Sequence, residues 1–301
     1  MIVYQLMMLP GSELATKETR RTHGMTMRYR VLPRCFGNYP VAGKDVLGVE
    51  IEEVCIATNT LSFQDYLDCR FVHLLISIFY NDAVFGGMLK LIKAVGGSFF
   101  RWIEILGETA PTEALSKLFD EFKEMTQSEL WEDRVELERF VAEPGVIDRY
   151  ISGELGYNLI LTYKSLGMTL LADDVADLAH RSTEALLNEL GADSDENLQL
   201  LADIITFDTR RMSNIWETDS AAVTSVFNFD VERFLNEKDV LPVCKYRLNS
   251  PTTYRFVHDD VQRNVIDRNL EIFGNDIAGI TRILSKVYTK KLLRKPIRGA
   301  A

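Results

Sequence analysis

The chain contains 301 residues, with 34 Lys and Arg residues against 44 Asp and Glu residues, so its formal net charge is −10. Hydrophobic residues make up 47% of the chain, which supplies a packed core and excludes uniform disorder. The acidic balance argues against a general nucleic-acid binder, which needs a basic face to neutralise phosphates. The length predicts about two domains.

The four cysteines are far apart in the sequence and form no CxxC pair (Cys35, Cys55, Cys69, Cys244). This spacing predicts reduced, mostly buried thiols in a cytoplasmic protein rather than a disulfide framework. The N-terminal run 1–13 lacks the basic region and the cleavage site of a signal peptide. The longest later apolar run, 71–80, is too short for a transmembrane segment, so none is expected.

Short strands are expected near the N-terminus. The apolar run Ile2–Leu9 ends at a Pro-Gly turn, which is typical of a fully buried strand in a parallel sheet. Further strands are predicted at Met27–Val31 and Val49–Ile56, with loop signals between 33 and 43.

From Leu61 onward the hydrophobic spacing becomes helical. Helices are predicted at 63–81, 83–95, 98–106, 112–125, 130–142, 155–166, 170–190, 196–212, 231–236, 259–273 and 277–293, and one small hairpin at 245–257. The expected fold class is therefore mainly α (α+β). Its predicted parts are an N-terminal strand and connector segment, residues 1–60, and a large helical domain, residues 61–301.

Three stretches of the N-terminal part resemble one known family. They are QLMMLPGSEL at 5–14, RYRVLPRCFG at 28–37 and EEVCIATNTLSFQDY at 52–66. In this order they are similar to the last barrel strand, its following turn and the connector of cobalamin (B12)-dependent radical SAM enzymes. The resemblance covers about a quarter of the chain.

The resemblance implies a role in enclosing the substrate, since the C-terminal region of that family covers the open end of a partial barrel. It places Pro10, Gly11 and Ser12 near the cofactors. For the full-length family it implies S-adenosylmethionine, a [4Fe–4S] cluster and cobalamin. It also implies a small-molecule substrate. Either the protein is then a truncated or split form of such an enzyme, or a partner chain carries the other barrel strands.

The cluster motif CxxxCxxC of that family is absent. Cys35, Cys55 and Cys69 are separated by 20 and 14 residues, which does not suit three thiolates of one loop. No cofactor and no catalysis are therefore expected for this chain alone, no catalytic residue is assigned, and no metal site is predicted.

Several polar residues are candidates for substrate binding. Arg28 and Arg30 alternate along an expected strand and share a face, where guanidinium groups can hold a phosphate or carboxylate. Arg30, Arg34 and Cys35 are the candidate substrate-binding residues. A neighbouring cation lowers a thiol pKa, which would activate Cys35, and the alternative is a structural cysteine. The alternative is a structural ion pairing of these arginines with Glu52 and Glu53.

Two further motifs favour structural roles. Cys69 and His73 share a helix face four residues apart, as metal ligands do, but lie in an apolar stripe without a matching second pair. Asp259 and Asp260, after His258, are expected to cap a helix N-terminus.

The segment 282–298 carries seven basic residues and no acidic one. A basic helix end is favoured by the helix dipole, and the alternative is contact with an acidic partner or a membrane surface.

Two other functional classes stay open. The first is a non-enzymatic helical interaction protein whose N-terminal strand docks onto the sheet of another chain. The second is a small-molecule-binding protein with a pocket formed by Arg30, Arg34, Phe36 and Tyr39.

Overall fold

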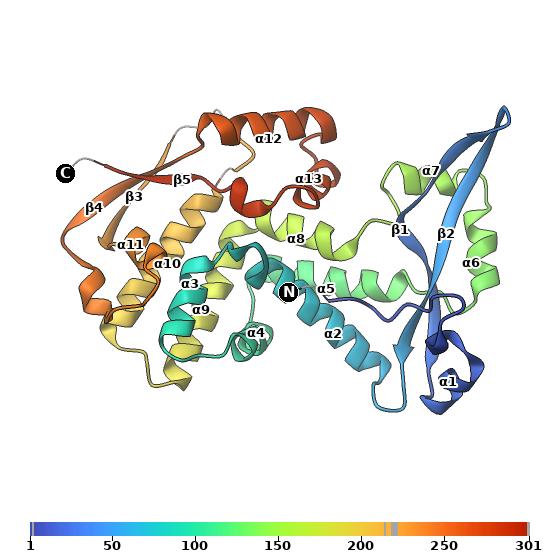
Figure 1. Ribbon diagram of the computed structural model, residues 1–301, viewed down its shortest axis with the longest axis horizontal. Helices are drawn as coiled ribbons and strands as arrows, with labels where there is room; N and C mark the ends of the chain where they lie inside the picture. Colours follow the sequence, from blue (N-terminus) through green and yellow to red (C-terminus); the bar gives the residue numbers. More distant parts are fainter. Residues whose placement is uncertain (2, 214, 218–221, 300–301) are drawn as a thin grey trace. The chain divides into compact units, whose positions relative to one another are not determined.

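The computed structural model describes the whole chain except residues 2, 214, 218–221 and 300–301 (Figure 1). The fold is mainly α with two small antiparallel sheets, which confirms the predicted class. The chain forms two compact units. We call Ile2–His73 with Phe119–Thr162 the hairpin unit, and Met1, Leu74–Leu118 and Tyr163–Ala301 the helical unit. The division predicted at residue 60 stays a prediction, and the boundaries of these units lie elsewhere.

A long antiparallel hairpin organises the hairpin unit. Strand β1, Thr26–Val41, pairs with β2, Lys44–Ala57, through a turn in which Ala42 and Gly43 have positive φ angles of 50° and 74°. Both predicted strands are confirmed, but β1 continues through most of the expected loop. The register shifts between Val31 and Phe36, so the loop signals there produce a bulge rather than a break.

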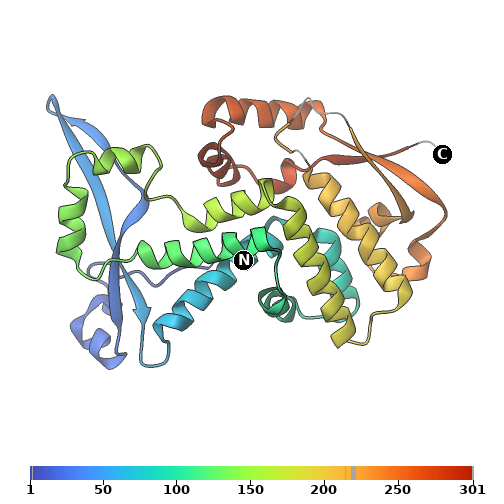
Figure 2. The same cartoon turned by 180° about the vertical axis from the view of Figure 1, so that it is seen from behind.

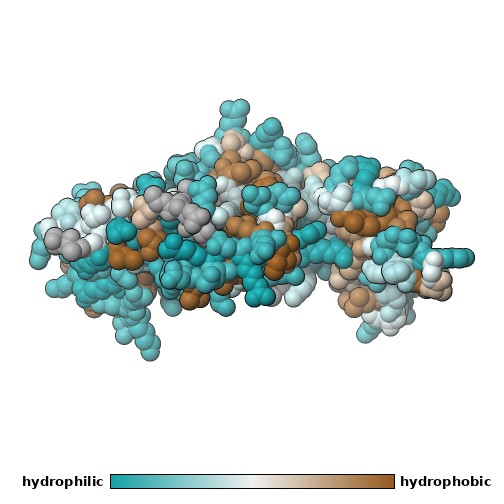
Figure 3. All heavy atoms as spheres, turned by 90° about the horizontal axis from the view of Figure 1, so that it is seen from above, coloured by the Kyte–Doolittle hydropathy of each residue, from teal (hydrophilic) through white to brown (hydrophobic). Residues whose placement is uncertain are grey.

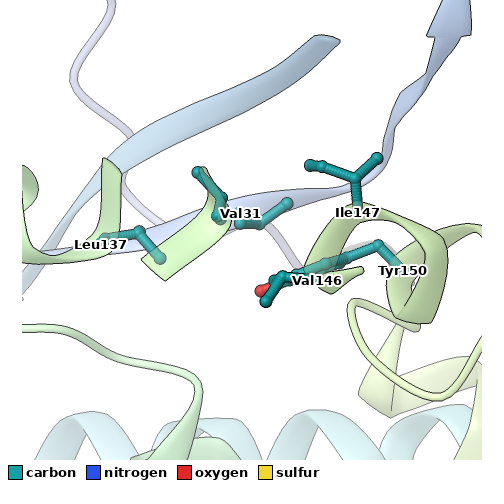
Figure 4. Packing of buried hydrophobic residues seen from close by; sticks show 6 residues of the cluster. Val31, Leu137, Val146, Ile147 and Tyr150 are labelled. Carbon is teal, nitrogen blue, oxygen red and sulfur yellow. The ribbon is translucent and has the colours of Figure 1, made fainter. Parts of the chain in front are cut away.

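One face of the hairpin packs against two short helices, α6 (Arg134–Val141) and α7 (Val146–Ile151). Val31 lies among buried residues of both helices, and Leu137 and Tyr150 are among those labelled in Figure 4. Figures 1 and 2 both show α6 and α7 beside β1 and β2. Asp133 caps α6 by accepting hydrogen bonds from two backbone amides.

The opposite face of the hairpin packs against α2, Phe63–Leu75. Val54 and Ile56 of β2 form a buried cluster with Tyr66 and Leu67 of α2. Ser62 caps α2 as predicted, because its hydroxyl accepts a hydrogen bond from the Asp65 amide at 3.1 Å. Helix α2 continues as a π-helical turn, Ile76–Tyr80, called η2.

The N-terminal segment differs from its prediction. Residues 3–9 are largely exposed and make only one isolated antiparallel bridge, between Met7 and Val54, so they are not a buried strand of a parallel sheet. Ile2, the first residue of the predicted strand, lies outside the described residues. A 3₁₀ turn, η1 (Glu13–Ala15), and the unpredicted helix α1 (Lys17–Thr22) follow this segment.

The remaining helices largely match the predicted ranges. Their bounds are α3 Gly86–Ala94, α4 Phe99–Glu108, α5 Glu113–Ser128, α8 Leu159–Thr169, α9 Ala172–Glu189, α10 Asp195–Met212, α11 Val231–Asn236, α12 Asp260–Phe273 and α13 Ile277–Leu284. The predicted helix 277–293 is the main exception, because it ends at Leu284 and is followed by the 3₁₀ turn η5 (Thr289–Lys291).

Three strands in the order β3-β4-β5 form the sheet of the helical unit. They are Val223–Phe229, Arg247–Val257 and Lys295–Arg298. The segment predicted as a small hairpin, 245–257, is instead the 3₁₀ turn η4 (Val243–Tyr246) running into the single strand β4. Its Asn-Ser-Pro signal does not turn the chain, because β3 and β5 supply the pairing partners.

The sheet of the helical unit packs on α10 through aromatic rings. Phe207 of α10 makes edge contacts with Phe227, Tyr254 and Phe256, with ring centroids 5.3 to 6.1 Å apart. Asp203, one turn earlier, accepts hydrogen bonds from the amides of Asn228 and Phe229 and fixes the irregular end of β3.

On the face seen in Figure 3, hydrophobic patches lie among hydrophilic residues. Within the described residues, no single helix is long and apolar enough to cross a membrane. One pair of helices, Phe63–Ala83 and Gly86–Ala94, meets the length and composition test together but is bent by 92°.

The packing between the hairpin and α6 can be tested by a substitution that shortens a buried side chain. Leu137 is fully buried, so Leu137→Ala is expected to lower the free energy of unfolding by about 2–5 kcal/mol through lost burial and a residual cavity. Val135 of the same helix is 50% exposed, and Val135→Ala should change stability by less than about 0.5 kcal/mol. Urea denaturation measures both, and equal losses would contradict the observed packing.

Candidate functional site

Strand alternation places a cluster of charges inside the hairpin unit. On β1, Tyr29 and Val31 point to one face and Arg30 to the other, and Arg30 stands directly opposite Glu52 of β2. Because helices cover both faces at this level, the charged pair is buried along with the apolar residues. Arg30 is 8% exposed and Glu52 is 9% exposed.

The guanidinium of Arg30 connects four parts of the hairpin unit. Its Nε donates to Glu52, one terminal nitrogen donates to Glu129 just after α5, and the other donates to the carboxamide oxygen of Gln5. The amide nitrogen of Gln5 in turn donates to the hydroxyl of Tyr66 on α2, at 2.5 Å. We call Gln5, Arg30, Glu52, Tyr66, Arg70 and Glu129 the charge cluster.

Burial and charge act in opposite directions within the cluster. Burial acts to lower the pKa of Arg30, but the carboxylates of Glu129 and Glu52 outweigh it and raise that pKa above its usual value. Burial raises the pKa of Glu129 despite the nearby charges of Arg30 and Arg70. Burial also lowers the pKa of Arg70. The cluster therefore holds its charges against a substantial desolvation cost.

The structural alternative, in which the hairpin arginines pair with Glu52 and Glu53, is observed for Arg30 and Glu52, whereas Arg28 and Glu53 pair with other residues. Besides Arg30 with Glu52, Arg28 contacts Glu132 at 2.6 Å. Glu53 accepts two hydrogen bonds from Arg20 of α1, at 2.6 and 2.7 Å, in the bidentate geometry typical of guanidinium and carboxylate. Each of the three guanidinium nitrogens of Arg30 thus donates to a group of this chain.

The predicted cofactor-binding residues form a surface turn. The Ser12 amide donates to the Leu9 carbonyl at 3.1 Å, with Pro10 and Gly11 between them and a φ of 81° at Gly11. Pro at the second and Gly at the third position are typical of a type II turn. Whether Pro10, Gly11 and Ser12 approach a cofactor stays a prediction.

Arg34 and Cys35 lie in the bulge of β1. Arg34 has a φ of 67° and is exposed, while Cys35 is half-buried. Burial, and then the charge of Glu50, raises the pKa of the Cys35 thiol. Activation by a neighbouring cation is therefore the wrong alternative for Cys35, and substrate contact by either residue stays a prediction.

The other cysteines differ from the expectation of mostly buried thiols. Cys55 is buried, but Cys69 and Cys244 are exposed. Cys69 is exposed because it lies on the side of helix α2 that faces away from the apolar stripe. Burial, followed by the charge of Arg70, lowers the pKa of His73 to about 4, so its imidazole is neutral at neutral pH. Within the described ranges no group of three or more His, Cys, Asp or Glu residues could hold a metal ion.

The helix cap at Asp259 is confirmed. Asp259 and Gln262 form a capping box at the start of α12, with the Gln262 amide 2.8 Å from the Asp259 carboxylate. Part of the basic C-terminal segment pairs within the chain, since Lys295 contacts Asp259 and Arg298 contacts Asp230 at 3.2 Å.

Sequence reasoning missed four members of the charge cluster: Gln5, Tyr66, Arg70 and Glu129. Tyr66 and Arg70 are one helical turn apart, and an arginine within a predicted apolar stripe is the signal that could have found them. Arg70 is 7% exposed. Gln5 and Glu129 carry no such signal, because only the tertiary fold brings them to Arg30.

A second buried carboxyl lies in the helical unit. Asp208 of α10 is 1% exposed, and one of its oxygens accepts a hydrogen bond from the Gly87 amide at the start of α3, at 3.2 Å. Its other oxygen has no partner within the described residues. Burial raises the pKa of Asp208 to about 7, against the opposing effect of Arg211.

The charge cluster can be tested by removing its central cation. Arg30→Ala leaves Glu52 and Glu129 buried without their partner, so it should lower the free energy of unfolding by about 3–5 kcal/mol. Arg28→Ala is the matched control, because its partner Glu132 is 78% exposed and such pairs contribute about 1 kcal/mol or less. Denaturation curves that show the same loss for both variants would contradict a buried role for Arg30.

Asp208 predicts a specific pH dependence. Its folded pKa of about 7 lies above the ordinary value of 3.8, so the folded state holds a proton that the unfolded state releases between these values. The Asp208 contribution therefore lowers stability as pH rises from about 4 to 7. Asp208→Asn stays neutral, so its stability relative to the unaltered protein should increase from pH 5 to pH 8, by up to roughly 3 kcal/mol. A difference that does not change with pH, measured by urea denaturation, would refute the shift.

Comparison with known proteins adds no family to these observations. No protein-family model matches the chain. No curated protein matches it as a relative. Functional conclusions therefore rest on the residues and geometry of the chain itself.

Proposed function

We propose that this chain is the substrate-enclosing region of a cytoplasmic B12-dependent radical SAM enzyme. Radical initiation then depends on barrel strands that carry the CxxxCxxC motif, on this or another chain, together with S-adenosylmethionine, the [4Fe–4S] cluster and cobalamin. The three N-terminal stretches at 5–14, 28–37 and 52–66 support the proposal by their resemblance to that family. This chain contributes shape and contacts to a small-molecule substrate.

The observation that carries the proposal is the open edge of the N-terminal segment. The Leu6 carbonyl accepts a hydrogen bond from Cys55 at 2.9 Å, and the Met8 amide donates to Glu53 at 2.8 Å. In this antiparallel pattern the backbone groups of Met7 point away from β2, and they have no hydrogen-bond partner within the described residues. An extended segment with one free edge can pair with a further strand.

The side chains of the same segment favour contact with another apolar surface. Tyr4 is 82% exposed, Leu9 is 62% exposed, and Leu6 and Met7 are each about 40% exposed. A group of large apolar side chains on one short exposed segment is typical of an interaction site rather than of a solvated surface. A barrel strand beside residues 3–9 would cover both the open backbone edge and these side chains.

The alternative is a non-enzymatic interaction protein, which the same open edge also favours. The two functions differ in what binds there. The enzyme requires a sheet that carries cluster ligands, and the interaction protein requires only an extended strand or an apolar surface.

The open edge gives the test. The protein, tagged at its C-terminus and purified anaerobically from its own cells, should carry iron, a CxxxCxxC sequence on the same or a co-purifying polypeptide, and S-adenosylmethionine cleavage. Met7→Pro removes the outward N–H without breaking an internal hydrogen bond, and should reduce cleavage at least tenfold. Leu14→Ser, at a 45% exposed position outside the segment, is the control and should retain cleavage.

Two results would overturn the proposal. One is purified material in which no polypeptide carries a cluster motif, which would favour the interaction protein. The other is a stoichiometric [4Fe–4S] spectrum with S-adenosylmethionine cleavage from residues 1–301 alone, which would show that the inference from cysteine spacing is wrong.

A further inference from the structure

Arg70 is a buried cation without an ion-pair partner. It is 7% exposed, and its Nε makes no hydrogen bond. No other hydrogen bond or salt bridge to its guanidinium is found in the described part of the chain, and the guanidinium lies over the Phe122 ring, 6.0 Å from the ring centroid, in a cation–π contact. The carboxylates of Glu52 and Glu129 act on it electrostatically, but both are hydrogen-bonded to Arg30. A buried arginine with unused donors is unfavourable for folding, which calls for a functional explanation.

The Tyr66 hydroxyl adds a second unused donor on the same helix face. Its oxygen accepts a hydrogen bond from Gln5, and no hydrogen bond donated by this hydroxyl is found within the described residues. Tyr66 and Arg70 are four residues apart on α2, which places their side chains next to each other. A guanidinium beside a hydroxyl donor is the combination that binds a carboxylate.

A third unsatisfied atom restricts the ligand further. The second carboxylate oxygen of Glu52, Oε2, is buried and accepts no hydrogen bond. It requires a donor, whereas Arg70 and Tyr66 require an acceptor. A small organic acid with a hydroxyl or amino group beside its carboxylate carries both, and a simple inorganic anion carries only acceptors.

We propose that Arg70 and Tyr66 bind the carboxylate of a small hydroxy or amino acid within the charge cluster of the hairpin unit. Arg30 takes no direct part, because Glu52, Glu129 and Gln5 already engage it. Its role is positional, since it holds the two glutamates away from Arg70 and so keeps that cation available. The binding concerns this chain by itself and does not require the proposed barrel, so either proposal can fail alone.

The test uses glycolate as the probe, with acetate and ethylene glycol as its two halves. Calorimetric titration of the full chain at pH 7 should show saturable binding of glycolate, at least tenfold weaker binding of acetate, and none of ethylene glycol. Arg70→Met should abolish glycolate binding, and Arg70→Lys, which keeps the charge but loses the planar donor pair, should weaken it at least tenfold. Arg28→Met, which alters an exposed pair of the same hairpin, should bind glycolate normally.

A stability measurement separates binding from a structural role. Removing an uncompensated buried cation should raise the Tm of Arg70→Met in the absence of glycolate, whereas loss of a structural contact would lower it. The proposal is overturned if glycolate shows no saturable binding, if binding survives in Arg70→Met, or if Arg70→Met and Arg70→Lys both lower the Tm. The first result is the one expected if ordered water alone occupies the unpaired atoms.

Discussion

The hairpin unit depends on the burial of Arg30. Its side chain follows the alternation of a strand whose two faces are both covered, so the residue cannot reach solvent without breaking the register with Glu52. The resulting guanidinium gathers Glu52, Glu129 and Gln5 around one point. The guanidinium thereby fixes four separate segments of the chain to one another. An unpaired charge of this kind would be more stable in water, so its burial depends on these partners.

Other buried charged residues of the chain have hydrogen-bond or ion-pair partners, which Arg70 lacks within the described residues. Asp203 accepts two backbone amides at the irregular end of β3, and Asp208 accepts the Gly87 amide at the start of α3. Lys164, 4% exposed, contacts Asp82 at 2.6 Å, which supports a turn with a φ of 63° at Asp82. Each of these charges satisfies a backbone or side-chain group. Within the described residues Arg70 makes no hydrogen bond or salt bridge and has only its cation–π contact with the Phe122 ring, which is why a ligand explains it better than architecture does.

Local pattern was enough to predict most of the elements and part of the charge cluster. Helical spacing identified most of the long helices, and of the arginine–glutamate pairs expected in the hairpin the one between Arg30 and Glu52 is found. The prediction failed where the result depends on what lies opposite a segment. Residues 3–9 have the composition of a buried strand, but composition cannot say whether neighbours exist on both sides. Sequence composition also did not show what packs against each side of α2. Arg70 was therefore not recognised among its apolar neighbours, and Cys69 was expected to be buried.

The N-terminal segment connects the two proposals physically. On its inner side, Gln5 bridges Arg30 and Tyr66, and on its outer side the backbone of Met7 is open. Two hydrogen bonds to β2 hold the segment between these environments. A strand that pairs with the outer edge would fix the position of Gln5, and with it the hydroxyl of Tyr66 that stands beside Arg70. Pairing of a further strand with the outer edge would thus order one of the hydrogen-bond donors of the charge cluster. A small acid bound in the cluster would in turn favour that pairing by the same free energy, since such coupling is reciprocal.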